Sequence, residues 1–180
     1  MSQTIKLHKL GTFEVVSNKL IISDPMFDVS PEMLPSGNCI SNVIEVKNGI
    51  WHAYVYEKSN RISKLVIHHS NIQLNDIFFT SNNISRMEST SGLAGFFDAK
   101  HYRDNTIICD SINLPIPCED KWYDMCSYIT NNSQIHSGIV PYGVVSIRCY
   151  DEEWFYVYPG YHKNDTSNSN LLALQLIFFN

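Results

Sequence analysis

The stretch Ser-Gly-Leu-Ala-Gly-Phe-Phe-Asp spans residues 91–98 and combines two glycines, an aromatic pair and a terminal carboxylate. Glycine inside a strand-like run is typical of a bulge or of a close approach between backbones. The rest of the run is apolar, which predicts a buried strand with a kink that ends at Asp98. Lys100, His101 and Arg103 follow directly, so titratable groups gather where this strand ends. We therefore expect the fold to be organised around residues 91–98.

Short strands separated by turn residues are predicted before this stretch. The β-rich segments are residues 12–16, 20–23, 40–46, 50–57 and 61–69. Asn48-Gly49 is a strong hairpin signal because both residue types tolerate positive φ. With a second turn at Ser59-Asn60, the segments between residues 40 and 69 are expected to form a three-stranded antiparallel meander.

The strand at residues 50–57 has two distinct faces, because successive side chains of a strand point in opposite directions. One face carries Trp51, Ala53 and Val55, and the other carries His52, Tyr54 and Tyr56. The first set predicts the core side of the sheet, whereas the second could line a groove.

The second half of the chain adds strands and one helix. Strands are predicted at residues 77–79, 84–90 and 171–179, a hairpin at 143–158, and a helix at 119–130. Many short strands with turn signals favour an all-β architecture. We predict one mainly β (α+β) domain over residues 1–180, in which antiparallel hairpins form a β-sandwich or strongly bent sheet with one short helix packed on it.

Composition excludes several classes of function. The formal net charge is −5, and no window gathers the Lys and Arg residues that a nucleic-acid backbone requires. No apolar run is long enough to span a membrane, and residues 1–10 lack the apolar region of a signal peptide. The five cysteines are irregularly spaced and form no Cys-x-x-Cys pair. A cytoplasmic protein without a cofactor or structural metal is the simplest interpretation, and the sequence leaves its oligomeric state open.

Four blocks of the chain resemble the bacterial and phage family of unknown function numbered 4241. These blocks are residues 17–25, 48–69, 91–98 and 143–158. The resemblance supplies no established activity, and it implies a bacterial or phage setting in which defence or counter-defence is one possible role. In the last block the family's three glycines fall at Cys149, Asp151 and Glu153. Such glycines permit positive φ and close contact with an anion, so this chain is expected to have lost or rebuilt any anion-contacting loop there.

Histidine and carboxylate residues offer one candidate cleft. Asp98, His101 and Asp104 are close enough in sequence to form an acid–base group, although a carboxylate at a strand end is also a common turn cap. His68 and His69 are adjacent on a strand and point to opposite faces, so they cannot both bind one metal in regular geometry. We expect one of them to face the core and the other to face solvent. A metal would require His52 or His101 to converge with one of them, which the sequence leaves open.

Aromatic residues offer two candidate binding surfaces. Tyr54 and Tyr56 share a strand face, and aromatic rings with polar ends suit recognition of a ligand or partner. The acidic run that contains Asp151 and Glu153 leads into Trp154 and Tyr156, and exposed aromatics rimmed by charge often mark partner contacts. The alternative for this hairpin tip is that its charges only solvate it.

These patterns favour a non-enzymatic binding protein that holds a protein partner or sequesters a small ligand. The predicted binding residues are Asp151, Glu153, Trp154, Tyr156, Asp98, His101, Tyr54 and Tyr56. The alternative is a hydrolase or nucleotide-processing enzyme that uses Asp98 and His101, with His68 or His69, in one cleft.

Overall fold

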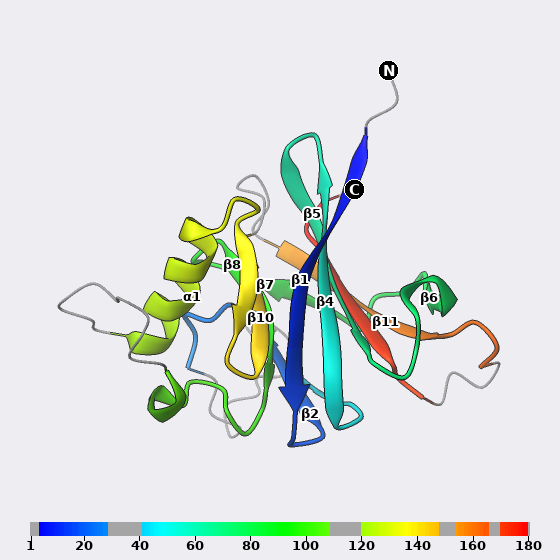
Figure 1. The fold of residues 1–180 in the computed structure, drawn as a ribbon, viewed down its shortest axis with the longest axis horizontal. Coiled ribbons are helices and arrows are strands. Elements are labelled where there is room, and N and C mark those ends of the chain that lie inside the picture. Colours follow the sequence, from blue (N-terminus) through cyan, green and yellow to red (C-terminus); the bar gives the residue numbers. More distant parts are fainter. Residues whose placement is uncertain (1–3, 29–40, 109–119, 148–153, 166–169, 180) are drawn as a thin grey trace.

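The computed structural model describes residues 4–28, 41–108, 120–147, 154–165 and 170–179. Within these residues two antiparallel sheets pack face to face, and one α-helix covers the outside of the smaller sheet (Figure 1). This arrangement confirms the predicted mainly β fold with a strongly curled sheet and a packed helix.

The larger sheet has seven strands in the described residues. Its order is β1 (Ile5–Val15), β4 (Gly49–Lys58), β5 (Arg61–His69), β12 (Ala173–Ile177), β11 (Trp154–His162) and β6 (Ile77–Phe79), with β7 (Ser85–Glu88) also paired to β11. The last of these strands in the chain, β12, therefore lies in the middle of the sheet between β5 and β11.

The smaller sheet has five strands in the described residues. Its order is β3 (Ser41–Glu45), β2 (Lys19–Ser23), β8 (Leu93–Asp98), β10 (Gly143–Ile147) and β9 (Ser137–Val140). All six residues of β8 are buried, which confirms the buried strand predicted to end at Asp98. Strand β9 was not predicted from the sequence.

Two hairpins predicted from the sequence are wrong. Strand β3 belongs to the smaller sheet and β4 to the larger, so Asn48-Gly49 connects two sheets and the predicted meander over residues 40–69 does not form. Strands β10 and β11 are divided between the sheets in the same way. The predicted hairpin tip, including Asp151 and Glu153, lies outside the described residues. The predicted turn at Ser59-Asn60, where both residues have positive φ, does join paired strands, β4 and β5, as expected.

The main core fills the space between the two sheets. It includes Trp51, Ala53 and Val55 of β4, which confirms the face predicted to be buried. Several strands supply alternate side chains to this layer, such as Leu20 and Ile22 of β2 and Leu174 and Leu176 of β12, which is the period of two expected in a sandwich.

A second apolar cluster joins the smaller sheet to helix α1 (Lys121–Asn132). Asp120 caps the helix, because its side chain accepts a hydrogen bond from the Tyr123 backbone N–H. Trp122, Met125 and Cys126 point toward the sheet, as their helical spacing predicts. Two short 3-10 segments, η1 (Leu74–Asp76) and η2 (Asn105–Ile107), lie in connections.

Over the part of the chain that the structure describes, no helix has the length and apolar character needed to cross a membrane.

Candidate ligand pocket

The outer face of the larger sheet brings two histidines together. His52 of β4 and His68 of β5 are directly opposite each other in the antiparallel ladder. Their ring centroids are 5.1 Å apart, and the ring of Tyr54 stacks on His68 with a centroid distance of 5.5 Å. The even positions of β4 face away from the core, so the alternation that buries Trp51 and Ala53 also places these rings on the outer face.

The hydrogen bond made by His68 determines which of its nitrogens carries the proton. Its Nδ1 lies 3.1 Å from the backbone oxygen of His69, and because a carbonyl can only accept, Nδ1 must be the donor. In the neutral ring, Nε2 then carries a lone pair. His68 is only 3% exposed, and its Nε2 has no hydrogen-bond partner among the described residues. Nδ1 of His52 is likewise buried without a hydrogen-bond partner among the described residues.

These side chains line a pocket with a volume of about 420 Å³. The other wall is the chain that follows β5, where η1 turns back over the sheet and Ile72 anchors a small apolar cluster. The complete lining is Lys9, His52, Tyr54, His68, Ser70, Ile72, Gln73, Leu74 and Asn75. Pockets of this size, with a few polar groups directed inward, are typical of small-molecule sites.

The environment of the pocket favours the neutral form of both imidazoles. Burial lowers the pKa of His52, and the positive charge of Lys9 lowers it further. Burial is also the largest influence on His68, whose pKa is lowered despite the opposing interactions of its ring with the backbone of His69 and Ile72. The pocket of the free protein at neutral pH therefore offers imidazole lone pairs beside one ammonium group.

His69 points to the opposite face of β5, as adjacent residues of a strand should. Its ring meets the edge of Trp51 at a centroid distance of 5.6 Å, and its Nε2 lies 3.0 Å from the backbone oxygen of Asn48. The prediction that one of the two histidines faces solvent is wrong, because both are buried. His69 fastens the connection between the sheets, and His68 forms the floor of the pocket.

Asp98 lies outside this pocket and has a structural environment. Its Oδ2 accepts hydrogen bonds from the Val16 and Ser17 backbone N–H groups and from the Ser17 hydroxyl, at 2.8–2.9 Å. Its Oδ1 accepts from the Lys100 backbone N–H. The side chain is fully buried, so its carboxylate joins the end of β8 to the turn after β1.

His101 does not approach the carboxylate of Asp98 through any contact in the described structure. Its ring stacks on Tyr142 with a centroid distance of 3.9 Å, and its Nδ1 is 3.8 Å from Asp104 Oδ2. His101 and Asp98 are joined instead through the backbone, where the His101 N–H donates to the Asp98 carbonyl. Asp98 and His101 thus share a turn, while their side chains have different partners.

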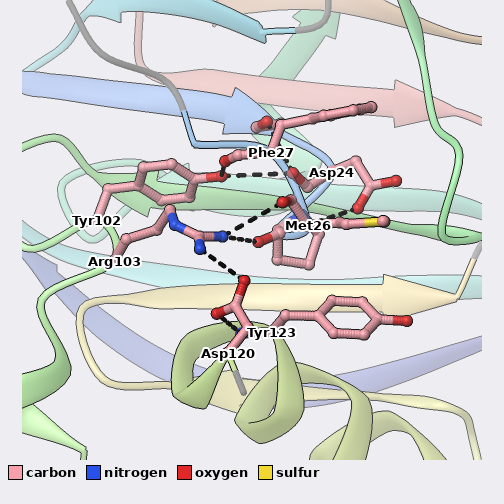
Figure 2. A network of polar contacts seen from close by, with 9 residues as sticks. Asp24, Met26, Phe27, Tyr102, Arg103, Asp120 and Tyr123 are labelled. Carbon is pink, nitrogen blue, oxygen red and sulfur yellow. Dashed lines mark hydrogen bonds and ion pairs between the residues drawn. The ribbon is translucent and has the colours of Figure 1, made fainter.

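A second buried carboxylate, Asp24, organises the other end of the same layer. It accepts hydrogen bonds from the backbone N–H groups of Met26, Thr90 and Ser91 and from the Ser89 and Ser91 hydroxyls. Close by, Arg103 donates to the Pro25 carbonyl and forms a 2.6 Å ion pair with Asp120 at the start of α1 (Figure 2). This network connects three segments of the chain and leaves no open carboxylate for a reaction.

The predicted aromatic residues come together across the outer face of the larger sheet. The pairing register places Tyr56, Lys64, Ile177, Tyr156 and Arg86 in one row across five strands. Arg86 also lies 3.9 Å from the centroid of the Trp154 ring, in a cation–π contact. Tyr54 lies on the same face, at the pocket. This long-range register could not be read from the separate segments.

Three parts of the pocket were missed from the sequence. The sequence suggests His68 as a metal ligand or as a member of an enzyme cleft with Asp98 and His101, but not as part of this pocket, and it gives no signal for Lys9 or residues 70–75. The alternation of β4 was the available signal for His52 and Tyr54. Lys9 lies opposite Tyr54 in the β1–β4 ladder, and the register of this ladder shifts between Lys9 and Gly11. No group of three or more His, Cys, Asp or Glu side chains in the described residues is arranged to hold a metal ion.

No protein-family model, curated protein or solved structure matches this chain. The resemblance to family 4241 therefore stays a prediction, and the function must be inferred from the pocket itself.

Proposed function

We propose that this chain is a non-enzymatic binding protein that holds a small ligand in the pocket formed by His52, Tyr54, His68 and the wall at residues 70–75. The observation that carries the proposal is the Nε2 atom of His68. This atom is buried in a residue that lines the pocket, and Nδ1 of the same ring is already committed to the His69 carbonyl. A buried polar atom without a partner costs free energy, which a ligand with a hydrogen-bond donor would recover.

The surroundings of Asp98 and His101, the candidate catalytic groups, favour binding over hydrolysis. The carboxylate of Asp98 is occupied by four hydrogen bonds from the protein, and His101 packs against Tyr142. A general base needs a free lone pair within reach of the proton that it removes. Two histidines in the pocket have free lone pairs, but no carboxylate lines that pocket to orient them.

Native mass spectrometry tests the proposal on protein purified gently from its host. We expect the unmodified protein to carry a bound small molecule, and we expect the His68→Gln variant to lose it. The exposed His136→Gln variant is the matched control and should keep the ligand.

A second readout covers the case in which the ligand is lost during purification. The ¹⁵N resonances of the His52 and His68 rings should shift when mononucleotides, sugar phosphates, amino acids or dicarboxylates are added. The proposal is wrong if the purified protein carries nothing and none of these compounds moves either ring. It is also wrong if the only retained species is a protein whose binding depends on Trp154 and Arg86.

A further inference from the structure

We propose that the ligand carries a phosphate monoester group, held by Lys9, His52 and His68, and that the imidazoles take up a proton when it binds. This inference rests on the proposed function and adds the chemical class of the ligand. No covalent bond forms or breaks; the proton comes from solvent, and the phosphate stays intact.

The charge of the pocket is opposite to that of the chain. The protein has 18 acidic against 13 Lys and Arg residues, yet none of the nine residues that line the pocket is acidic. Lys9 supplies a positive charge from β1, and Ser70, Gln73 and Asn75 supply uncharged polar groups from the opposite wall. This absence of carboxylates among the lining residues lets an anion approach without repulsion from them.

The hydrogen bond of His68 explains why binding requires a proton. Its Nδ1 proton is used on the His69 carbonyl, so a second proton must go to Nε2, the buried ring nitrogen that has no hydrogen-bond partner in the described residues. Protonation turns that acceptor into a charged donor, which is the group that a phosphate oxygen prefers. Lys9 and two imidazoles can then supply one donor to each of the three terminal oxygens.

A metal ion fits the same lone pairs less well. The ammonium group of Lys9 would repel a cation, and within the described residues no carboxylate, thiol or third imidazole completes a ligand set. The volume of about 420 Å³ also leaves room for an organic group against Tyr54, Ile72 and Leu74.

The expected pH dependence follows from the groups that face the two imidazoles. Lys9 from β1 and Tyr54 from β4 are the ionisable neighbours within the pocket, His69 acts on both rings from the other face of β5, and the lining groups of the opposite wall are uncharged. Burial favours the neutral form of both rings in the free protein, and Lys9 adds to this effect at His52, so a proton must be taken up from solvent when the anion binds. Affinity should therefore rise as the pH falls from about 8 to about 6.5, where phosphate monoesters are still mostly doubly charged.

Isothermal titration calorimetry with phenyl phosphate tests this inference, with inorganic phosphate, benzoate and Zn²⁺ as comparison probes. Measurement in two buffers of different ionisation enthalpy should show uptake of about one proton per bound phenyl phosphate at neutral pH. Benzoate has the same ring with a carboxylate, so it should bind at least about tenfold more weakly. Zn²⁺ should not displace phenyl phosphate.

Variants locate the binding in the pocket. Lys9→Ala should weaken phenyl phosphate binding by about tenfold or more, since it removes one charged donor. His68→Gln should abolish the proton uptake. Lys9 is exposed, so its variant should fold even if His68→Gln does not. Lys100→Ala replaces an exposed lysine whose side chain lies outside the pocket, and it should leave the affinity unchanged.

Two results would overturn the inference. One is phenyl phosphate binding without proton uptake, or with equal affinity for the Lys9→Ala variant. The other is a shift of the His52 and His68 resonances with benzoate or Zn²⁺ but not with either phosphate, which would leave the pocket as a ligand site of another class. If no probe moves those resonances and the purified protein carries no small molecule, the proposed function fails as well.

Discussion

Asp98 illustrates how a residue that looks catalytic in the sequence can serve the fold. A carboxylate at the end of a central strand, followed by a histidine, is a reasonable acid–base candidate. In the structure its two oxygens accept four hydrogen bonds, three of them from Val16 and Ser17, which lie more than 80 positions earlier in the chain. The turn-cap interpretation therefore accounts for every contact that this side chain makes in the described structure.

The Asp98→Asn substitution should lower the free energy of unfolding by about 2–3 kcal/mol. The amide that replaces one carboxylate oxygen is a donor, and it would face either the donors of Val16 and Ser17 or the N–H of Lys100. Urea unfolding followed by tryptophan fluorescence measures the loss. Asp104→Asn is the control, because this carboxylate is partly exposed and should change stability by no more than about 0.5 kcal/mol. A fully stable Asp98→Asn variant that no longer binds its ligand would instead place this carboxylate in a functional site.

At the scale of elements, the sequence predicts strands well but their partners poorly. Alternation predicted the buried face of β4, and the apolar run at residues 92–98 predicted β8, because both signals are local. Pairing depends on contacts far away in the chain. The backbone oxygen of Asn48 is held by His69 and its side chain by the Asn18 N–H, so a sequence typical of a hairpin becomes a connection between sheets.

The pocket likewise combines features that follow from local sequence with features that depend on distant contacts. The position of His52 and Tyr54 on one face follows from the period of β4. Their meeting with His68 depends on the β4–β5 register, and the opposite wall depends on how residues 70–75 fold back over the sheet. Neither property is encoded in one short segment, so the site could only be predicted in part.

Gly95 shows what the pairing of β8 with β10 demands. A side chain added at this position would collide with the backbone oxygen of Val144 and with the ring of Phe97. We expect Gly95→Ala to destabilise the protein by about 2–3 kcal/mol, because neither the strand nor the buried ring has room to move. Differential scanning calorimetry would show the lowered midpoint, with Lys100→Ala as the exposed control. An unchanged midpoint would mean that β8 and β10 can separate without cost.

On the scale of the whole molecule, apolar clusters hold together three layers, namely the larger sheet, the smaller sheet and helix α1. Arg103 adds polar contacts between the helix and the smaller sheet. Its guanidinium reaches the Pro25 carbonyl after β2 and the Asp120 carboxylate that caps α1 (Figure 2). This single side chain therefore links the helix layer to the smaller sheet beyond their shared hydrophobic contacts.

The Arg103→Met substitution should loosen α1 selectively. Hydrogen exchange monitored by mass spectrometry should show faster exchange in residues 121–132, while exchange in β4 and β5 stays unchanged. The expected loss is about 1–3 kcal/mol of local stability, because Asp120 and the Pro25 carbonyl lose a charged donor. Lys121→Met changes an exposed cation on the same helix and should have no such effect. Uniformly faster exchange in both sheets would show that the helix is not a separate unit.

The place of β12 in the larger sheet has a consequence for synthesis on the ribosome. Strand β5 ends at His69, but the neighbour that completes its ladder begins only at Ala173. Until β12 leaves the exit tunnel, β1, β4 and β5 have no bridge to β11, and the edge of β5 stays open with Leu65 and Ile67 beside it. An unpaired apolar edge invites pairing with other nascent chains. The two halves of the sheet must therefore wait for each other while the roughly one hundred residues between His69 and Ala173 are synthesised, and over that interval we expect this protein to benefit more from chaperone protection than one whose strands pair in the order of their synthesis.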